Sequence, residues 1–470
     1  MRSLSPSLRK ARPHGLGHPL TLLACIVLGA CGGGGGSAES STAAAAAAAP
    51  APGPTQAPAP GPAATPGPGP ALAPAPALPT TGPVYYFSDC QAGAATACVP
   101  GSNANAGTSA AAPRQNLSGF DVNALAAGSQ LRFARGGAWT NFNLQLRNLN
   151  ATPTQPLVLD SYLPAWGGTA PPVLQTASGN AINFGTYSDT VVDGGYAIRN
   201  LKFDGGGTAV WGLFLMGETR NVTLENNEIT GFEIAAHFQN MGVVGNTALT
   251  IRNNHIHHNR EMGMLGDANN LVIEGNTIAN NNFSGSGFNH GLYLGGNAVN
   301  GIVRNNRFTN NSVVNGVCLG GNLTVHGQWD GLLIEGNTVT QALSASGCWG
   351  ISINDGYPSA EFFRNVVVRG NTVRNLECAL CIRSSPGIVI ENNFITSNQP
   401  QLPTAIVVVP PNGSNDDPGL NPVVRNNIVC FVSPNLGAAP VRITVSGGSE
   451  TGTVYRTGAD ATTGACAAAL

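Results

Sequence analysis

A short phrase recurs along the C-terminal half of the chain and limits the possible folds more than any other feature. Each copy has aliphatic residues, a charged residue, an Asn or Gly, and then an Asn that is present every time. The copies are spaced 22 to 34 residues apart. They end at Asn227, Asn254, Asn276, Asn306, Asn337, Asn371, Asn393 and Asn427. Internal repeats at this interval are typical of solenoids, in which every repeat forms one layer.

The recurring Asn predicts a ladder of stacked side chains. Neighbouring strands of a parallel stack lie about 4.8 Å apart. A side-chain amide has both donors and an acceptor, so each one can bond the amides above and below it. Such a ladder closes a turn and satisfies backbone groups that would otherwise be buried without partners.

The charged position alternates in sign from copy to copy, which indicates direct stacking. Opposite charges on neighbouring strands stabilise a sheet by roughly 0.2–1 kcal/mol per pair, and like charges destabilise it. In chain order the position holds Arg199, Glu225, Arg252, Glu274, Arg304, Glu335, Arg369, Glu391 and Arg425. We therefore expect residues some thirty apart in the chain to become vertical neighbours on one sheet.

A second apolar segment in each repeat predicts another strand. Its second and fourth residues are mostly apolar and should point inward, and its third should point outward. Aligned on their first residues, these segments begin at Gly212, Ala235, Glu261, Gly291, Gly316, Gly350, Ala379, Ala405 and Val441. Coils of variable length without a regular helix pattern argue against a leucine-rich repeat, and parallel crossovers are nearly always right-handed. The prediction is an all-β, right-handed parallel β-helix of roughly ten coils over residues 131–470, with an N-terminal cap at 84–130.

The N-terminal segment has the features of an export signal and a tether. Four basic residues precede a short apolar stretch that ends at Ala30-Cys31, which is too short to span a bilayer permanently. That junction resembles the lipobox of bacterial lipoproteins. The resemblance implies a signal peptide at 1–30, lipidation at Cys31, and an outer-membrane or cell-surface protein attached to the membrane through this anchor. An ordinary signal peptide with a chance cysteine is the alternative. Residues 31–83 are mostly Gly, Ala and Pro and predict a disordered linker.

Charge and cysteine content narrow the partners of the exported chain. Residues 1–30 carry four of the 22 basic residues and none of the 24 acidic ones, so the remainder is net acidic. The sequence therefore lacks the cluster of basic residues that a nucleic-acid-binding surface needs. We also expect the protein to be a monomer. Eight cysteines follow Cys31, an even number that suggests disulfides in an exported chain. The pairs expected from register and proximity are Cys348–Cys378, Cys90–Cys98 and Cys430–Cys466. Metal–thiolate chemistry is the weaker interpretation, because Cys378-Ala-Leu-Cys381 has no second such motif.

Residues from about 115 to 470 resemble the right-handed parallel β-helix, pectate-lyase-like superfamily. The opening stretch resembles that of bacterial members with carbohydrate-active relatives, at Tyr85-Tyr86-Phe87, Asn103–Thr108 and Leu131–Gly137. The resemblance implies a surface protein that acts on a polysaccharide, as a polysaccharide lyase or related hydrolase for an acidic polymer. Because this scaffold also serves adhesins and phage tailspikes, a non-catalytic glycan-binding or adhesin-type display protein is the alternative.

The outward positions of the second strand predict a polar trough with small residues on its floor. His290 and Tyr293 are the main candidates for catalytic residues in this trough. A lyase acting on uronates needs a base, an acid and a neutraliser of the carboxylate, and His290, Tyr293 and Arg383 suit these roles. The expected substrate-binding residues are His237, Gln239, Asp267, Asn354 and Asp355. The alternative is a purely structural role, in which His290 caps a turn and Tyr293 packs on the surface.

The sequence does not identify a cofactor, although binding of Ca²⁺ is compatible with it. Asp267 and Asp355 could bind Ca²⁺ or act as the carboxylate pair of a hydrolase. Lys202 is the only lysine of the folded region and is better explained as part of a coil turn. His255, His257 and His258 could be metal ligands, but polar stacking at a turn explains them more simply.

Overall fold

The computed structural model describes residues 81–185, 191–215, 218–239, 245–284, 288–311, 313–314, 317–342, 348–398, 404–432 and 440–469. The expected signal peptide, Cys31 and nearly all of the expected linker lie outside these ranges. Within them, no helix is long and apolar enough to cross a membrane.

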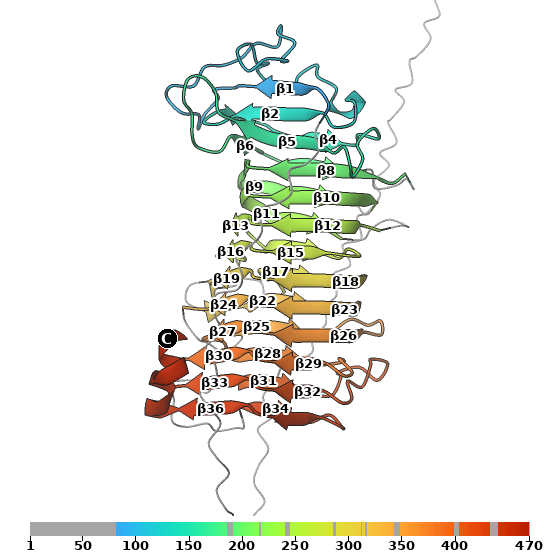
Figure 1. The fold of residues 1–470 in the computed structure, drawn as a ribbon, viewed down its shortest axis with the longest axis vertical. Coiled ribbons are helices and arrows are strands. Elements are labelled where there is room, and N and C mark those ends of the chain that lie inside the picture. The colour runs from blue at the N-terminus through green and yellow to red at the C-terminus, as the bar shows by residue number, and fades with distance from the viewer. Residues whose placement is uncertain are drawn as a thin grey trace, which may run out of the picture. The chain divides into compact units, whose positions relative to one another are not determined.

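The chain forms a right-handed parallel β-helix in which every coil adds one strand to a long sheet, here called the first sheet (Figure 1). Its thirteen described strands are parallel and lie in chain order. They are β1 (Val84–Phe87), β2 (Gln130–Ala134), β5 (Leu157–Tyr162), β8 (Asp193–Arg199), β10 (Thr219–Glu225), β12 (Thr247–Arg252), β15 (Val272–Glu274), β18 (Asn297–Arg304), β23 (Gln328–Glu335), β26 (Phe362–Arg369), β29 (Val389–Glu391), β32 (Val423–Arg425) and β35 (Ser449–Thr451). Because β1 pairs with β2 in parallel, the sheet already begins within the segment expected to be a cap.

A second ladder of strands follows the turn after the first sheet. It comprises β3 (Ala138–Trp139), β6 (Val173–Gln175), β9 (Lys202–Leu215), β11 (Glu228–Phe238), β13 (His255–His257), β16 (Thr277–Ala279), β19 (Arg307–Thr309), β24 (Thr338–Thr340), β27 (Thr372–Arg374), β30 (Phe394–Ser397), β33 (Ile428–Phe431) and β36 (Val454–Thr457). Its strands also pair in parallel, coil on coil.

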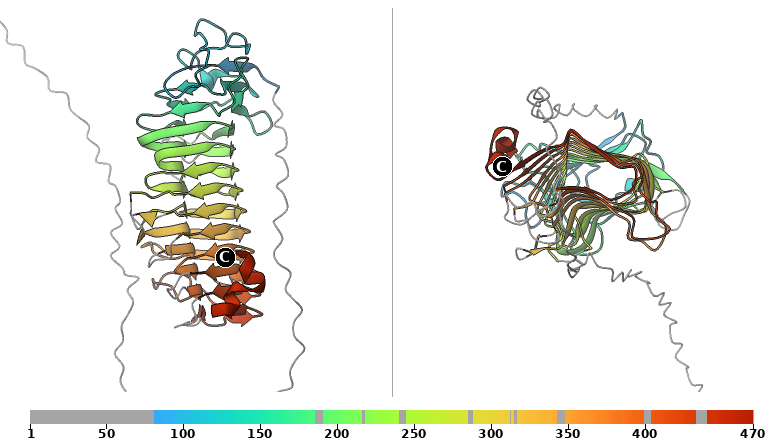
Figure 2. Two further views of the ribbon diagram at one scale, coloured as in Figure 1. Left: turned by 90° about the vertical axis from the view of Figure 1, so that its left-hand side faces the viewer. Right: turned by 90° about the horizontal axis from the view of Figure 1, so that it is seen from below.

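A third ladder completes each coil and carries the outward positions of interest. It comprises β4 (Leu144–Leu146), β7 (Ile182–Phe184), the C-terminal parts of β9 and β11, then β14 (Met262–Gly266), β17 (Leu292–Leu294), β22 (Gly320–Val325), β25 (Cys348–Ile353), β28 (Cys378–Ile382), β31 (Thr404–Val408) and β34 (Val441–Ile443). The end-on view in Figure 2 shows the strands of successive coils superposed around the axis. Short elements outside the ladders are η1 (Val122–Ala124), the antiparallel pair β20 (Val313–Val314) and β21 (Val317–Cys318), η2 (Gly458–Thr462) and η3 (Gly464–Ala469).

The Asn ladder forms as predicted and closes the turn between the first sheet and the second ladder. The Nδ2 of each Asn donates to the Oδ1 of the next at 2.9–3.1 Å, from Asn227 to Asn427. The residue before each ladder Asn has positive φ, for example Asn305 (φ 55°) and Gly336 (φ 63°). Asn and Gly tolerate this left-handed conformation best, which explains why only these two types occupy the position.

The alternating charges stack in register, as predicted. Glu274 pairs in register with Arg304, and Arg304 with Glu335. Ion pairs join Glu to Arg of the next coil at 2.6–3.0 Å. The column extends further than the sequence indicated, because Asp160 forms ion pairs with Arg132 and Arg199, each at 2.7 Å.

The core is a continuous column of aliphatic and aromatic side chains inside the coils. The apolar residue two positions after the ladder Asn is fully buried in successive coils, as in Ile256, Ile278, Phe308 and Val339. Burial of one such side chain stabilises a fold by roughly 1.5–3 kcal/mol. Consequently, each coil is stable only when its neighbours cover it.

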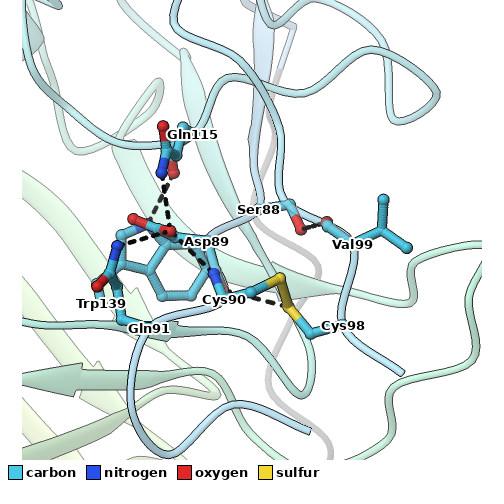
Figure 3. The surroundings of a disulfide bond; sticks show 8 residues. All are labelled: Ser88, Asp89, Cys90, Gln91, Cys98, Val99, Gln115 and Trp139. Atoms are coloured by element: carbon cyan, nitrogen blue, oxygen red, sulfur yellow. Dashed lines mark hydrogen bonds between the residues drawn. A yellow bond between two sulfur atoms is a disulfide. The ribbon is translucent and has the colours of Figure 1, made fainter. Parts of the chain in front are cut away.

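Two of the three expected disulfides are present. Cys90–Cys98 fastens the N-terminal region, where the Asp89 carboxylate accepts hydrogen bonds from Cys90 N at 2.9 Å and Gln115 Nε2 at 3.2 Å (Figure 3). Cys430–Cys466 fastens the C-terminal segment to β33.

The expected Cys348–Cys378 bridge is wrong, because Cys378 is bonded to Cys381 in its own strand. The register explains this result. Cys378 lies beside Trp349 of the adjacent coil, and Cys348 lies beside Gly320 of the coil before.

The third ladder corrects the predicted alignment in three coils. Leu265, not Gly263, lies between His237 and Tyr293. Thr324, not Cys318, follows Tyr293, and Cys318 is buried in β21 instead. Near the C-terminus, Val441 pairs with Ile406 rather than Ala405. Longer insertions between strands shifted these segments, and the apolar pattern alone does not reveal such shifts.

Candidate functional site

Two positions of the third ladder, three residues apart in the chain, lie side by side in three of the described coils. Their proximity is seen in the ring pairs Trp211–Phe214, with centroids 4.1 Å apart, and His290–Tyr293, at 5.3 Å. The Cys378–Cys381 disulfide joins the same two positions. Side chains at these positions therefore act together, coil by coil, on one face.

The central cluster on this face consists of two tyrosines and a histidine from three coils. The hydroxyls of Tyr293 and Tyr357 lie 2.6 Å apart, a hydrogen-bond distance. The ring of His326 lies 5.4 Å from that of Tyr293 and stacks on that of Tyr357 at 5.2 Å. All three residues are half-buried, so the cluster reaches solvent.

Glu361 is buried next to this cluster. Its Oε1 lies 3.4 Å from His326 Nδ1 and accepts a hydrogen bond from Gly327 N. Its Oε2 accepts from Gly356 N and, at 2.6 Å, from Tyr357 N. Burial raises the pKa of Glu361, but the adjacent His326 ring and the hydrogen bonds from these amides outweigh it and leave the pKa below its usual value. The carboxylate is thus ionised at neutral pH.

His290 is buried behind Tyr293. It is only 4% exposed, and Gly321 N donates to its Nδ1 at 2.9 Å. A backbone N–H can only donate, so Nδ1 carries no proton. Burial, assisted by nearby His326, lowers the pKa of His290 to about 3. His290 is therefore a neutral ring that supports Tyr293, and Tyr293 separates it from solvent-facing groups.

Glycine at position 295 allows the two tyrosines to meet. A Cβ there would lie 3.0 Å from Tyr357 Oη and 3.1 Å from Tyr293 Cε1, closer than side chains tolerate without moving. Gly295 thus creates the space in which the hydroxyls approach each other.

Asn354 and Arg383 lie beyond the cluster toward the C-terminus. Their backbone amides continue the coil-on-coil pairing that places His326, Asn354 and Arg383 in one column. Asn354 Nδ2 donates to Ser352 Oγ, and Arg383 Nη1 donates to Pro410 O at 2.6 Å. The spacing of about 4.8 Å per coil puts Arg383 roughly 10 Å from His326 along the axis.

Asp267 and Asp355 do not come together. The register separates them by three coils, about 14 Å. Each is buried, and Asp355 accepts from Ser384 Oγ at 2.6 Å and Asn412 N at 2.9 Å. Carboxylate pairs of glycosidases lie roughly 5–9.5 Å apart, so this arrangement does not fit a hydrolase pair.

His237 and Gln239 lie two coils from Tyr293 in a separate group. His237 Nε2 is 3.2 Å from Gln239 Oε1, and its ring packs against Trp211 at 4.8 Å and Phe214 at 5.1 Å. Burial lowers the pKa of His237 to about 4. Both His237 and Phe214 are at most 6% exposed, so this group is mainly a packed aromatic cluster.

Among the described residues, the other histidines lie on or just after β13 of the second ladder. His255 and His257 stack at 4.0 Å, and Glu228 forms an ion pair with Lys202 at 2.7 Å. Within the described residues, no group of three or more His, Cys, Asp or Glu side chains could hold a metal ion. Lys202, which the sequence explains as part of a coil turn, is the first residue of β9 and forms this ion pair.

Of the predicted catalytic residues, Tyr293 lies in the cluster and His290 is buried behind it; His326, Tyr357 and Glu361 are not among the residues predicted from the sequence. The predicted second strand of this coil begins at Gly316, whereas the structure aligns Asn322 with Gly291 of the coil before. The difference of six residues leaves His326 out of the predicted outward column. The available signal is Leu323-Thr324-Val325, where apolar residues flank a polar one at the end of β22. Tyr357 and Glu361 come from the loop after β25, whose path no strand pattern predicts.

Comparisons with known proteins bear on the fold. A family model described as "Right handed beta helix region" matches residues 190–342. No curated protein matches the sequence.

Similar solved structures share little sequence with this chain. The alginate lyase of Paenibacillus sp. is 15% identical, with 71% of this chain and 93% of the lyase covered and a TM-score of 0.36. The lacto-N-biosidase of Eubacterium ramulus is 12% identical, with 80% and 68% covered and a TM-score of 0.39. The mannuronan C-5 epimerase A-module of Azotobacter vinelandii is 13% identical, with 70% and 87% covered and a TM-score of 0.37. At these values none of them assigns an activity to this chain.

Proposed function

We propose that this protein is a surface-anchored polysaccharide lyase that cleaves an acidic polymer by β-elimination at the cluster of Tyr293, His326 and Tyr357. The observation that carries the proposal is this cluster itself, in which a histidine lies 3.4 Å from an ionised carboxylate and beside two hydrogen-bonded tyrosines. The anchor at Cys31 belongs to the proposal as an expectation from the sequence.

His326 supplies the base. The negative charge of Glu361 facing Nδ1 favours a proton on that nitrogen and leaves a lone pair on Nε2. In the elimination Nε2 takes the C5 proton of a uronate, and the electrons of that C–H bond form the C4–C5 double bond. The C4–O bond then breaks, and the leaving oxygen takes a proton from the Tyr293–Tyr357 pair.

An acidic substrate follows from the chemistry of the proton to be removed. A C5 proton is acidic enough only beside a carboxylate whose charge is neutralised. Asn354 and Arg383, in the column of His326, are the groups that suit this role. Hydrolysis is less favoured, because Glu361, Asp267 and Asp355 are each buried and accept bonds from backbone amides.

The test is an assay on alginate, pectate and glycosaminoglycans that records both ultraviolet absorbance of unsaturated ends and new reducing ends. Elimination raises both signals together. Reducing ends alone indicate hydrolysis, and binding on a glycan array without either signal indicates the display-protein alternative.

The variants Tyr293→Phe, Tyr357→Phe and His326→Ala assign the site. We expect each to lower kcat by roughly 10²–10⁴-fold, the range for loss of a general acid or base. Tyr455→Phe, in β36 of the second ladder, is the matched control and keeps full activity. Unchanged turnover in all three site variants would refute the cluster as the active site.

A further inference from the structure

Glu361 is placed to connect two parts of the site that the chain builds separately. His326 follows β22 of the third ladder, whereas Tyr357 belongs to the loop between β25 and β26. Glu361 is the last residue of that loop, immediately before β26, and is 1% exposed. One carboxylate oxygen faces the segment of His326 and the other faces the loop of Tyr357.

Each oxygen serves one side of the connection. Oε1 accepts from Gly327 N and lies 3.4 Å from His326 Nδ1, on the side of the ladder. Oε2 accepts from Gly356 N and Tyr357 N, on the side of the loop. An ionised carboxylate only accepts, and it does so at full strength on both oxygens; the lowered pKa of Glu361 keeps it ionised.

A further loop fixes Glu361 itself. Glu361 N donates to Asp416 Oδ1 at 2.8 Å, and Asp417 N donates to Glu361 O at 3.1 Å. Asp416 Oδ2 also accepts from Gly413 N at 3.1 Å, which closes its own turn. These bonds fix the backbone from which the carboxylate extends, and the carboxylate's own hydrogen bonds fix its direction.

We propose that Glu361 is a positioning residue that sets the His326 ring and the Tyr357-bearing loop in one geometry. The inference rests on the proposed function for its kinetic consequences, and on the hydrogen bonds alone for its structural ones. Because all its oxygens are directed at protein groups and the side chain is buried, Glu361 does not contact the substrate.

The first test is Glu361→Gln, which preserves shape but replaces one oxygen with a donor. That NH₂ group must face either the amides of the loop or the side of His326 and Gly327, so one half of the connection fails. We expect kcat to fall by on the order of 10²-fold while KM stays within about twofold, as for a group acting on the transition state. Glu391→Gln, a ladder residue of the first sheet, is the matched control and leaves both constants unchanged.

Hydrogen exchange supplies a readout that needs no activity. In Glu361→Gln we expect faster exchange at the amides of Gly356 and Tyr357, or at Gly327, with no change at the amide of His326, which donates to Leu294 O at 2.8 Å. Unchanged exchange at all three amides would overturn the inference. If the wild type cleaves no polymer, the proposed function fails, and this exchange pattern still decides whether Glu361 connects the two parts.

A double-mutant cycle separates positioning from general destabilisation. If Glu361 acts through its two partners, Glu361→Gln costs much less activity when His326→Ala or Tyr357→Phe is already present. Additive losses in both backgrounds would contradict the inference. Glu361→Asp keeps the charge but is one methylene shorter, and it replaces the Gln variant if that variant does not fold. We expect slow hydrogen exchange to be retained either at Gly327 or at Gly356 and Tyr357, but not at both.

Discussion

Single residues show how burial decides which side chains can do chemistry here. His290 and His326 are both imidazoles close to Tyr293, yet only His326 reaches solvent. Full burial and a backbone donor at Nδ1 hold His290 neutral. The same residue type therefore supports the site in one position and takes part in it in the other.

Burial of neutral histidines predicts acid sensitivity. Burial lowers the pKa of His290 to about 3 and of His237 to about 4, whereas an unfolded histidine titrates near 6.5. The unfolded chain then binds more protons, so stability is full above about pH 6.5 and declines as the pH falls toward the folded-state values, by at most about 1.4 kcal/mol per pH unit for each group.

Replacing His290 removes part of this dependence. We expect His290→Gln, which can still accept from Gly321 N, to flatten the curve of unfolding free energy against pH between about 3 and 6.5. Urea unfolding at four pH values measures it. Parallel curves for variant and wild type would show that His290 does not titrate in this way.

At the scale of elements, the Asn turn sets the register between coils. The side-chain NH₂ of a ladder Asn donates to the side-chain oxygen of the next ladder Asn and to a backbone carbonyl. Asn306 donates in this way to Asn337 Oδ1 and to Ile273 O. These groups are buried, so no water replaces a lost partner. The turn thereby aligns the strands of the second ladder, which follow it directly.

The ladder position and the position before it should respond to substitution in opposite ways. Asn306→Ala leaves buried polar groups without partners and should cost about 1–3 kcal/mol or more of unfolding free energy. Asn305→Gly retains a residue that accepts the observed φ of 55° and should change stability little. Chemical denaturation of the two variants compares them, and equal losses would contradict this account of the turn.

At the scale of the whole molecule, the coils form a one-dimensional stack whose ends are fastened by disulfides. Cys90–Cys98 lies near the first described coil, and Cys430–Cys466 holds the C-terminal segment to β33. In a solenoid each repeat contacts only its neighbours, so the ends are the least protected parts.

Removal of one end fastening should therefore act locally. In Cys430→Ser/Cys466→Ser we expect faster hydrogen exchange in β33 and β36, with the amides of the central coils near β17 unchanged. Cys90→Ser/Cys98→Ser is the matched variant for the other end. Uniformly faster exchange throughout the stack would show that the coils unfold as one unit instead.

The sequence predicted the fold well because the features that build it are local and repeated. The Asn and charge columns recur at recognisable spacings, and both proved to stack in register from Arg199 to Arg425. Two end disulfides also followed from proximity along the chain. The position of Tyr293 on the third ladder was predictable for the same reason, since it is an outward position of a regular strand.

Only the tertiary structure decided which polar side chains meet. His326 depended on the path of an insertion between coils, and Tyr357 and Glu361 on a loop that folds back over the third ladder. Cys378 likewise bonds within its own strand rather than to the neighbouring coil. A repeat fixes neighbours along the stack because each coil must cover the next, whereas loops lie outside that constraint, and the contacts they make depend on the complete fold.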